Sequence, residues 1–453
     1  MTLTSLTITA LAGIGVALGL RWWRPAWYWL AFGAVIAVVR VLRRFRETME
    51  GCNLVIQPAE WRVAVAYASR SGLPPARPPR LVWLRPTRTG LRLWLKLRPG
   101  QSVTDFQEAA GRLRHAFEMH GVSAREVRPG VVQLRCTGYD VLRRVQMPRD
   151  VERALLRIPV ALREDGSVYY RDFRAAPHGL IVGASDSGKS TLQRRMIAEL
   201  ARQEVALVGI DCKRVELAPL ARRFSAMAED ADTAAGLLEA LVERMASVYE
   251  VIRREQRISA DTPDEAITSD IWGLPDYLRP VPIVLFIDEV AELLLATKAD
   301  KARRERIITA LVRLVQLGRA AGIYVEICGQ RLGADLGDGV TLLRAQLTNR
   351  ISHRVNEESS ARMTFGDIAD DALSAVLRIR PNRRGTAVAG DTSGRWRVIR
   401  APYTSLRRAV NVCNLYADLT PDLPELALYR PLLLPRPRLV EPTDVLLGRE
   451  HIA

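Results

Sequence analysis

The chain has 453 residues, 48% of them hydrophobic, so it is long enough for two or three domains with buried cores and is not a disordered tail. Its net charge of +16 predicts a polyanionic partner, either nucleic acid or an anionic membrane surface, although a genome that prefers Arg to Lys would give the same balance. The five cysteines form no C-x-x-C pair, which argues against a zinc site or a disulfide scaffold and predicts a reducing cytosol for the soluble part.

The N-terminal segment 1–46 reads as a transmembrane hairpin. Residues 3–20 carry no charge, and a second apolar stretch, 26–39, follows a short break that contains Trp and Pro. Arginines are denser after the second stretch than in the turn, so the positive-inside rule places the rest of the chain in the cytoplasm and predicts a two-pass protein of the cell membrane. A cleavable signal peptide is the alternative, but the charged start and the small-residue cleavage site are missing.

A basic, proline-rich linker is predicted over 47–79. Residues 41–100 contain 12 Lys and Arg against three Asp and Glu, which suits a segment that lies over a membrane or nucleic acid. A small α/β domain follows over 80–146. Apolar stretches at 81–84 and 91–97 predict a hairpin, 103–121 predicts a helix, and 131–136 predicts another strand.

A phosphate-binding loop is predicted at the sequence LIVGASDSGKSTLQ, which begins at Leu180. An apolar strand ends at Gly183, Gly188 permits a tight backbone, and the helix that follows offers its N-terminus and the Lys189 ammonium to the phosphates of ATP. The Ser190 hydroxyl would bind Mg²⁺. The alternative for the whole loop is a chance match to the P-loop pattern. The predicted nucleotide-binding residues are Gly183, Ala184, Ser185, Asp186, Ser187, Gly188, Lys189, Ser190 and Thr191.

An acidic pair is predicted on the metal side of this site. The apolar run 281–287 reads as a buried parallel strand, and Asp288 and Glu289 lie at its carboxyl end, where ligands of α/β sheets bind. Asp288 would hold the Mg²⁺ shell and Glu289 would act as the catalytic base toward water. The alternative is that the pair only caps the next helix.

Two further polar residues end predicted strands: Asp211 after 205–210, and Gln330, a candidate γ-phosphate sensor, after 322–329. Either could be simple strand-terminating chemistry. Amphipathic helices are predicted at 232–254 and 302–317. Alternation of strands and helices predicts an α/β fold with a wound, mostly parallel sheet of about five strands, a RecA-like P-loop core.

The ordered motifs resemble the FtsK/SpoIIIE family of DNA translocases over 80–400, with the motor at 147–400. The segments that carry the resemblance include GIDCKRVELAPL, VLFIDEVAELL, LGRAAGIYVEICGQR and LTNRISHRV. The resemblance implies a homo-hexameric ring that hydrolyses ATP between subunits and pulls double-stranded DNA through a basic channel. It also implies an arginine acting on the neighbouring subunit's phosphate, either Arg319 or Arg350, although each could instead be a structural ion-pair partner.

The chain departs from the chromosome-segregating members of the family. Leu332 stands where they usually have proline, and the tail 401–453, of unknown role, is expected to be too short for their DNA-reading winged helix. The compact, arginine-rich chain looks more like the transfer proteins of actinomycete plasmids and integrative elements. This predicts a membrane-anchored, ATP-driven translocase of double-stranded DNA in conjugation, with other element-encoded transfer proteins as further partners. A chromosome-partition translocase at the septum and a secretion-coupling ATPase stay open as alternatives.

Overall fold

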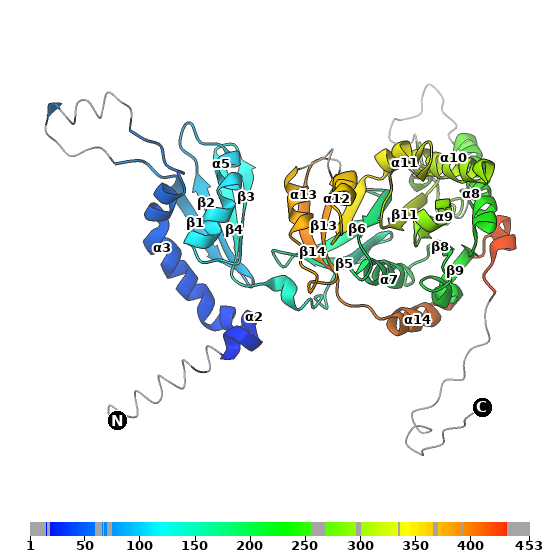
Figure 1. Cartoon of the computed structure of the whole chain (residues 1–453), viewed down its shortest axis with the longest axis horizontal. Coiled ribbons are helices and arrows are strands. Elements are labelled where there is room, and N and C mark those ends of the chain that lie inside the picture. Colours follow the sequence, from blue (N-terminus) through cyan, green and yellow to red (C-terminus); the bar gives the residue numbers. More distant parts are fainter. Residues whose placement is uncertain are drawn as a thin grey trace, which may run out of the picture. The chain divides into compact units, whose positions relative to one another are not determined.

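The computed structural model describes residues 15, 19–58, 66, 68–69, 75–255, 268–295, 300–333, 336–365, 370–391 and 393–432. The chain divides into two compact units, each described by itself (Figure 1). Unit 1 comprises 1–151, 161–169 and 397–401, and unit 2 comprises 152–160, 170–396 and 402–453. Unit 1 contains the N-terminal helix and a small sheet, and unit 2 contains the P-loop and the acidic pair.

An apolar helix of 27 residues, Pro25–Gly51, opens unit 1, and an 18-residue stretch within it has a mean hydropathy of 1.6. It consists of α2 (Pro25–Tyr28), a π-helical turn η1 (Trp29–Gly33) and α3 (Ala34–Gly51), and it begins at a proline, which suits a first helical position. The helix continues into the segment predicted as a linker. It is the one candidate span within the described residues, because most of the first predicted stretch, 3–20, lies outside them.

A four-stranded antiparallel sheet forms the rest of unit 1, in the order β1-β2-β4-β3. The predicted hairpin corresponds to β1 (Arg80–Pro86) and β2 (Gly90–Lys96), and the next predicted strand to β4 (Val131–Thr137). The sequence analysis missed β3 (Gly121–Arg128), because its mostly polar sequence carries no strand signal. The strand is defined by its antiparallel pairing with β4. The predicted helix is divided into α5 (Val103–Glu108), which starts at a Ser102 capping box, and α6 (Ala110–Ala116).

One face of this sheet carries the core of unit 1. Leu91, Leu93 and Leu95 of β2 are buried in one cluster with α3, α5 and α6. The indole of Trp29 lies so close to Gly138 that a Cβ there would be 2.1 Å from the ring, and its Nε1 donates to the Thr87 carbonyl at 2.9 Å. The N-terminal helix is therefore packed along one side against the small sheet.

A mixed sheet in the order β6-β5-β14-β13-β12-β7-β11-β10-β8-β9 forms the frame of unit 2, and parts of its strands β5, β6 and β14 belong to the ranges 161–169 and 397–401 of unit 1. Neighbours from β12 through β7, β11, β10 and β8 to β9 pair in parallel, whereas β13 pairs antiparallel with β12, and β14 with β5. The parallel core agrees with the predicted wound sheet, but the prediction of about five strands was too low. The strands are β5 (Arg157–Arg163), β6 (Val168–Asp172), β7 (His178–Val182), β8 (Ala206–Ile210), β9 (Phe224–Ala228), β10 (Ile283–Ile287), β11 (Ile323–Gly329), β12 (Asn349–His353), β13 (Thr386–Asp391) and β14 (Trp396–Arg400).

Helices cover this sheet, which is why its central strands are buried along their whole length. Leu180 and Val182 of β7 join the cluster under α8 and α10, which match the two predicted amphipathic helices. The α-helices of unit 2 are α7 (Lys189–Leu200), α8 (Ala231–Glu255), α9 (Val290–Leu295), α10 (Lys301–Leu317), α11 (Val340–Gln346), α12 (Glu358–Phe365), α13 (Asp370–Leu377) and α14 (Leu406–Leu415). Its 3-10 turns are η3 (Ala218–Arg223), η5 (Ile271–Gly273), η7 (Ala417–Leu419) and η8 (Pro424–Tyr429), and a further 3-10 turn, η2 (Val141–Arg143), lies in unit 1.

The first part of the C-terminal tail belongs to unit 2. Cys413 of α14 and Leu426 of η8 are fully buried, and the Ser225 hydroxyl of β9 donates to the Pro421 carbonyl at 2.8 Å. Arg244 of α8 forms an ion pair with Glu425. Residues 405–430 are thus a structural cover of the motor, a role that their Leu- and Pro-rich sequence did not reveal.

Candidate nucleotide site

The loop 183–188 connects β7 to α7 and is shaped by two glycines. Gly188 has φ +112°, and a Cβ on it would be 2.6 Å from the backbone of Gly385. A Cβ on Gly183 would be 2.6 Å from the Ser187 hydroxyl and 2.7 Å from the His353 Cβ. Only glycine fits at either position, so the loop can present its N–H groups at the start of α7.

Neighbouring strands hold this loop. The Ala184 N–H donates to the Arg354 carbonyl at 2.8 Å, and the Gly385 N–H donates to the Ser187 carbonyl at 2.9 Å. Arg384 forms an ion pair with Asp186 at the loop tip. Sequence reasoning missed these contacts, because they join positions 170 to 198 residues apart and no local pattern marks them.

Lys189, Asp288 and Glu289 meet at the carboxyl edge of the sheet. β11 lies between β7 and β10, so the loop after β7 and the acidic pair after β10 are two strands apart at one edge. The Lys189 Nζ donates to the Gly183 carbonyl, and burial lowers the Lys189 pKa while Glu289 opposes that shift. The structure brings together the residues that the sequence assigned to phosphate, metal and water.

Both carboxylate oxygens of Glu289 have partners. Oε1 accepts the Gln330 N–H at 3.1 Å, and Oε2 lies 3.8 Å from the Lys213 Nζ. Gln330 therefore contacts the candidate base through its backbone, and its side chain is exposed. Lys213 lies in the segment GIDCKRVELAPL, whose pattern assigns it no role, and only the fold places it beside Glu289.

Asp211 has a structural task at this edge. Its Oδ2 accepts the N–H groups of the next turn, from Glu216 at 3.0 Å, Leu217 at 2.8 Å and Ala218 at 3.1 Å.

Burial, and then the nearby carboxylates of Asp211 and Glu216, raise the pKa of Asp288 to about 7. Lys213 opposes this shift only in part, so the Asp288 carboxylate suits a ligand for an added cation.

The residues at this edge fit Mg²⁺ in an ATP complex. No group of three His, Cys, Asp or Glu side chains that could hold a metal occurs within the described part of the chain. Mg²⁺ needs no such cage, because it retains waters and takes one or two protein ligands together with substrate phosphates. The hydroxyl of Ser190, in the first turn of α7, and the carboxylate of Asp288 are the two candidate ligands.

The two candidate arginines lie elsewhere. Arg350 is buried, and its guanidinium donates to the carbonyls of Leu347, Thr364 and Arg344 at 3.0 to 3.2 Å. Arg319 is exposed and precedes the amino end of β11, at the edge of the sheet away from Glu289. Neither reaches the nucleotide site of its own chain.

Arg319 lines a pocket of about 410 Å³ with Arg174, Trp272 and Tyr324. The Arg174 guanidinium lies 4.2 Å from the centre of the Trp272 ring, and the Trp272 Nε1 donates to the Tyr324 hydroxyl at 3.2 Å. The pocket places a cationic, aromatic surface at the amino edge of the sheet.

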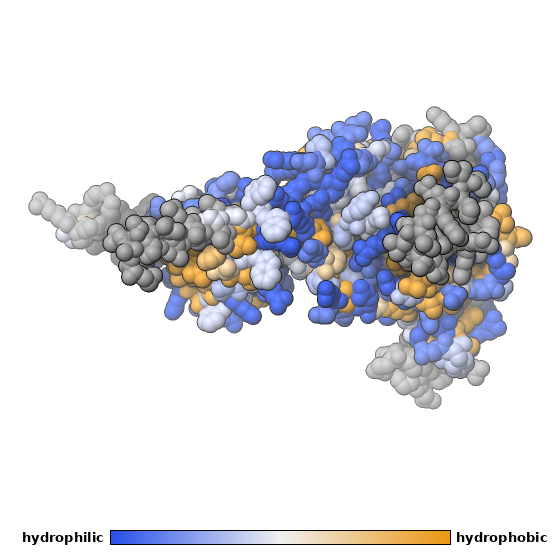
Figure 2. Space-filling model, turned by 90° about the horizontal axis from the view of Figure 1, so that it is seen from below, coloured by the Kyte–Doolittle hydropathy of each residue, from blue (hydrophilic) through white to orange (hydrophobic). Residues whose placement is uncertain are grey.

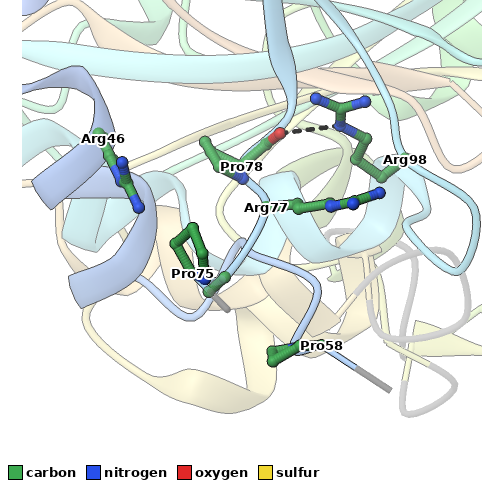
Figure 3. A pocket seen from close by; sticks show the side chains of 7 residues that line it. Arg46, Pro58, Pro75, Arg77, Pro78 and Arg98 are labelled. Atoms are coloured by element: carbon green, nitrogen blue, oxygen red, sulfur yellow. Dashed lines mark hydrogen bonds between the residues drawn. The ribbon is translucent and has the colours of Figure 1, made fainter. Parts of the chain in front are cut away.

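A second basic pocket, of about 300 Å³, lies in unit 1 (Figure 3). Arg46, Arg77 and Arg98 line it, together with three prolines. Arg46 already pairs with Glu50 at 2.9 Å, and the Arg98 Nε donates to the Pro78 carbonyl at 3.1 Å, as the dashed line in Figure 3 marks. Two of its three guanidinium groups therefore have partners within the chain.

Comparison with known families gives two adjoining matches. Residues 141–334 match the FtsK/SpoIIIE family, and residues 17–138 match the N-terminal domain of actinomycete conjugal transfer proteins. The boundary between the matches separates the small sheet of unit 1 from the motor.

Similar proteins cover the chain to different extents. The transfer protein TraSA of Streptomyces ambofaciens is 60% identical over 88% of this chain and 97% of its own length. A sporulation regulatory protein of Streptomyces azureus is 52% identical over 57% of this chain and 82% of its own. The DNA translocase FtsK of Chlamydia pneumoniae is 29% identical over 51% of this chain and 30% of its own.

Among solved structures, the pCW3 conjugation coupling protein TcpA, determined as a monomer with ATPgS, superposes with a TM-score of 0.52. The match covers 75% of this chain and 94% of that protein at 17% identity. At this identity the match supports a shared fold and nothing further. The α/β fold expected for the motor is thereby confirmed, with a mixed sheet. The described residues contain one apolar N-terminal helix, so the hairpin of two stays a prediction.

Proposed function

The chain belongs to the FtsK/SpoIIIE family, among its actinomycete conjugal transfer proteins, and from that premise we propose that it hydrolyses ATP to move double-stranded DNA during conjugation. The observation that carries the proposal is that Lys189 interacts electrostatically with Glu289 and Asp288 at one sheet edge, in a chain that matches a conjugal transfer protein along 97% of that protein. The nucleotide would be ATP, held by the residues from Gly183 to Thr191.

In the proposed mechanism, the N–H groups of the loop 183–188 and the start of α7 bind the phosphates. The Lys189 ammonium leaves the Gly183 carbonyl and turns to the β and γ phosphates, where its charge is compensated more strongly. Mg²⁺, held by Ser190 and Asp288, would supply charge neutralisation on the phosphate oxygens. Glu289 orients the attacking water and accepts its proton once its oxygens leave their present partners.

The proposal includes a homo-hexameric ring with Arg319 acting on the neighbouring subunit. Two observations support Arg319 over Arg350: its exposure, and its position at the sheet edge away from its own P-loop. Arg350 donates to three backbone carbonyls that would lose their partners if it turned outward. In a ring, an exposed arginine can stabilise charge on the phosphate of the next subunit.

We also propose attachment to the cell membrane with the motor in the cytoplasm. Exposed apolar side chains along the N-terminal helix support it, among them Trp27, Leu30 and Phe32, and Figure 2 shows hydrophobic residues gathered on this unit. The two-pass arrangement is part of the proposal. It requires the side of the helix that carries Trp29, Ala37 and Val41 to exchange its contact with the small sheet for lipid or for the first span.

The function is tested with the full chain in detergent. ATP turnover is measured with and without linear duplex DNA, and movement is measured as displacement of a third strand from the duplex. The proposal expects duplex DNA to stimulate turnover, displacement to require ATP, and Lys189→Ala to abolish both. Turnover that ignores duplex DNA but rises with a secreted protein would overturn it in favour of a secretion-coupling ATPase.

A further inference from the structure

The small sheet of unit 1 has one covered face and one open face. Side chains alternate along a strand, so the neighbours of the buried leucines of β2 point the other way. These are Arg92, Trp94 and Lys96, and both Arg92 and Lys96 are exposed. The open face is therefore the side of the sheet that α3, α5 and α6 do not cover.

Cations are lined up across this open face. Arg85 of β1 is paired with Arg92 of β2, and Arg92 with Arg135 of β4, so three guanidinium groups stand side by side in one row. Directly opposed like charges destabilise a sheet. No Asp or Glu occupies an outward position of the four strands. A row of this kind gains free energy when an anion lies along it.

The next row carries the aromatic groups. Trp83 of β1 is paired with Trp94 of β2, and the row ends at Arg125 of β3. Trp83 is 62% exposed, although burial of an indole is strongly favourable. A surface hollow of about 880 Å³ runs past both tryptophans and is bordered by Lys96 and Arg128. Two indoles between rows of cations form a surface for stacking and charge pairing together.

The charges on the open face are incompletely compensated within the unit. Arg135 has a carboxylate partner, Asp165, at 3.2 Å. Burial lowers the pKa of Arg135, and the nearby Arg92, Arg125 and Arg397 lower it further, whereas Asp165 raises it. Glu164 lies near Arg397 as well, so two carboxylates lie among four guanidinium groups. The cluster needs more negative charge than the unit supplies.

The partner that fits is a nucleic-acid strand rather than a bilayer. While the N-terminal helix packs on the sheet, its exposed apolar side points away from the open face. If the helix exchanges this contact for lipid, the face that becomes uncovered is the leucine face and not the basic row. A duplex would use the cations through its phosphates but would leave the tryptophans without bases to stack on. An unpaired strand uses both, since indole rings stack on bases while Arg and Lys follow the backbone.

We propose that the open face of the small sheet binds single-stranded DNA, with phosphates along Arg85, Arg92 and Lys96 and bases stacked on Trp83 and Trp94. The proposal rests on the proposed function in one respect, that DNA is the cargo. It adds a second DNA-binding surface outside the motor, suited to unpaired ends or gaps of the transferred molecule.

The test uses the full chain in detergent without nucleotide and a fluorescently labelled oligo-thymidine strand, with affinity measured by anisotropy. Trp94→Ala is expected to weaken binding about tenfold, the size of one lost base stack, while Trp94→Phe retains most of the affinity. The double variant Arg92→Gln/Lys96→Gln is expected to reduce the slope of log affinity against log salt by about 1.4, since about 0.7 is lost per phosphate contact.

The matched control is Arg112→Gln/Arg114→Gln, which removes two exposed charges from α6 on the covered side. It should leave both the affinity and the salt slope unchanged. Binding of the strand that is the same in Trp94→Ala and the unchanged protein would overturn the proposal. So would a loss confined to duplex DNA, to binding of anionic vesicles or to the oligomeric state, each of which would assign the face to that partner instead.

Failure of the proposed function would be seen separately. It would appear as ATP turnover that ignores duplex DNA in the unchanged protein, whereas the strand-binding measurement uses no ATP. Duplex-stimulated turnover is expected to stay within about twofold in the control Arg112→Gln/Arg114→Gln, because α6 carries neither motor residues nor the open face.

Discussion

The two sheets of this protein handle charge in opposite ways. The central strands of the motor sheet are buried on both faces, and charged groups inside it are matched, as Arg171 and Glu326 are at 2.8 Å with both side chains fully buried. The small sheet is covered on one face and leaves unmatched cations on the other. The contrast teaches where each unit can act: the motor at the edge where its strands end, and the small sheet across its open face.

The largest expected effect tests whether ATP hydrolysis takes place at the edge where the strands of the motor sheet end. Glu289→Gln keeps the shape of the side chain and removes the base, so ATP turnover should fall at least about 100-fold with little change in nucleotide binding. Steady-state kinetics and binding of a labelled ATP analogue measure the two quantities. Glu292→Gln, an exposed position on α9 three residues along, is the control and should be nearly neutral. Equal losses in both variants would break the assignment.

The interior of the motor sheet is tested at Gly179. A Cβ there would be 2.4 Å from both Glu326 oxygens, and the buried ion pair with Arg171 leaves that carboxylate no room to move. Gly179→Ala should therefore lower the free energy of unfolding by about 2–4 kcal/mol, as overpacking and disturbance of a buried pair do. Urea titration followed by circular dichroism measures the loss. Gly111→Ala, where nothing lies within 4 Å in helix α6, should cost nothing.

Buried histidines make the motor sensitive to acid in a way that the open sheet is not. Burial lowers the pKa of His178 to about 3 and that of His353 to about 4. The unfolded state then binds protons at higher pH than the folded state, so stability is full above about pH 6.5 and falls as the pH drops toward the folded values. Between pH 7 and 5 each histidine should cost about 2 kcal/mol of unfolding free energy.

Urea titrations at the two pH values measure this loss. Val325 donates its N–H to the His178 Nδ1 at 3.2 Å, a bond that protonation would remove. His178→Asn should reduce the pH dependence of stability by about half even if it lowers stability at pH 7. An unchanged dependence would show that His178 is not one of the titrating groups.

The smallest expected effect concerns the loop after β8. The ion pair of Lys213 with Glu289 is 3.8 Å long, and Lys213 is 39% exposed, so it is worth at most about 1 kcal/mol. Lys213→Met should free one oxygen of the base and raise turnover without DNA by up to about fivefold, with the KM for ATP unchanged. Arg214→Met, the next residue, removes a charge that pairs with Glu229 instead and is the control. A fall in turnover would assign Lys213 a direct role in catalysis.

The sequence by itself determined the parts of the motor whose signals are local. A strand, a glycine loop and a helix start are contiguous around Gly188 and Lys189, and an unbroken apolar run ending in Asp288 and Glu289 is readable as a buried strand. Because parallel strands end at a common edge of the sheet, the sequence pattern alone predicted that Lys189 and the acidic pair lie close together. The family followed as well, because its motifs are short, ordered segments.

Only the tertiary structure decided what depends on contacts between distant residues. It places Lys213 and the Gln330 N–H in contact with Glu289. It also directs the Arg350 guanidinium to three backbone carbonyls and packs residues 405–430 against the motor. It also set Arg85 beside Arg92 and Arg135, and Trp83 beside Trp94, by a strand order and a register that no single strand encodes. Side-chain pairing across a sheet is fixed by long-range hydrogen bonds, and a one-residue slip would have turned every one of these groups to the other face.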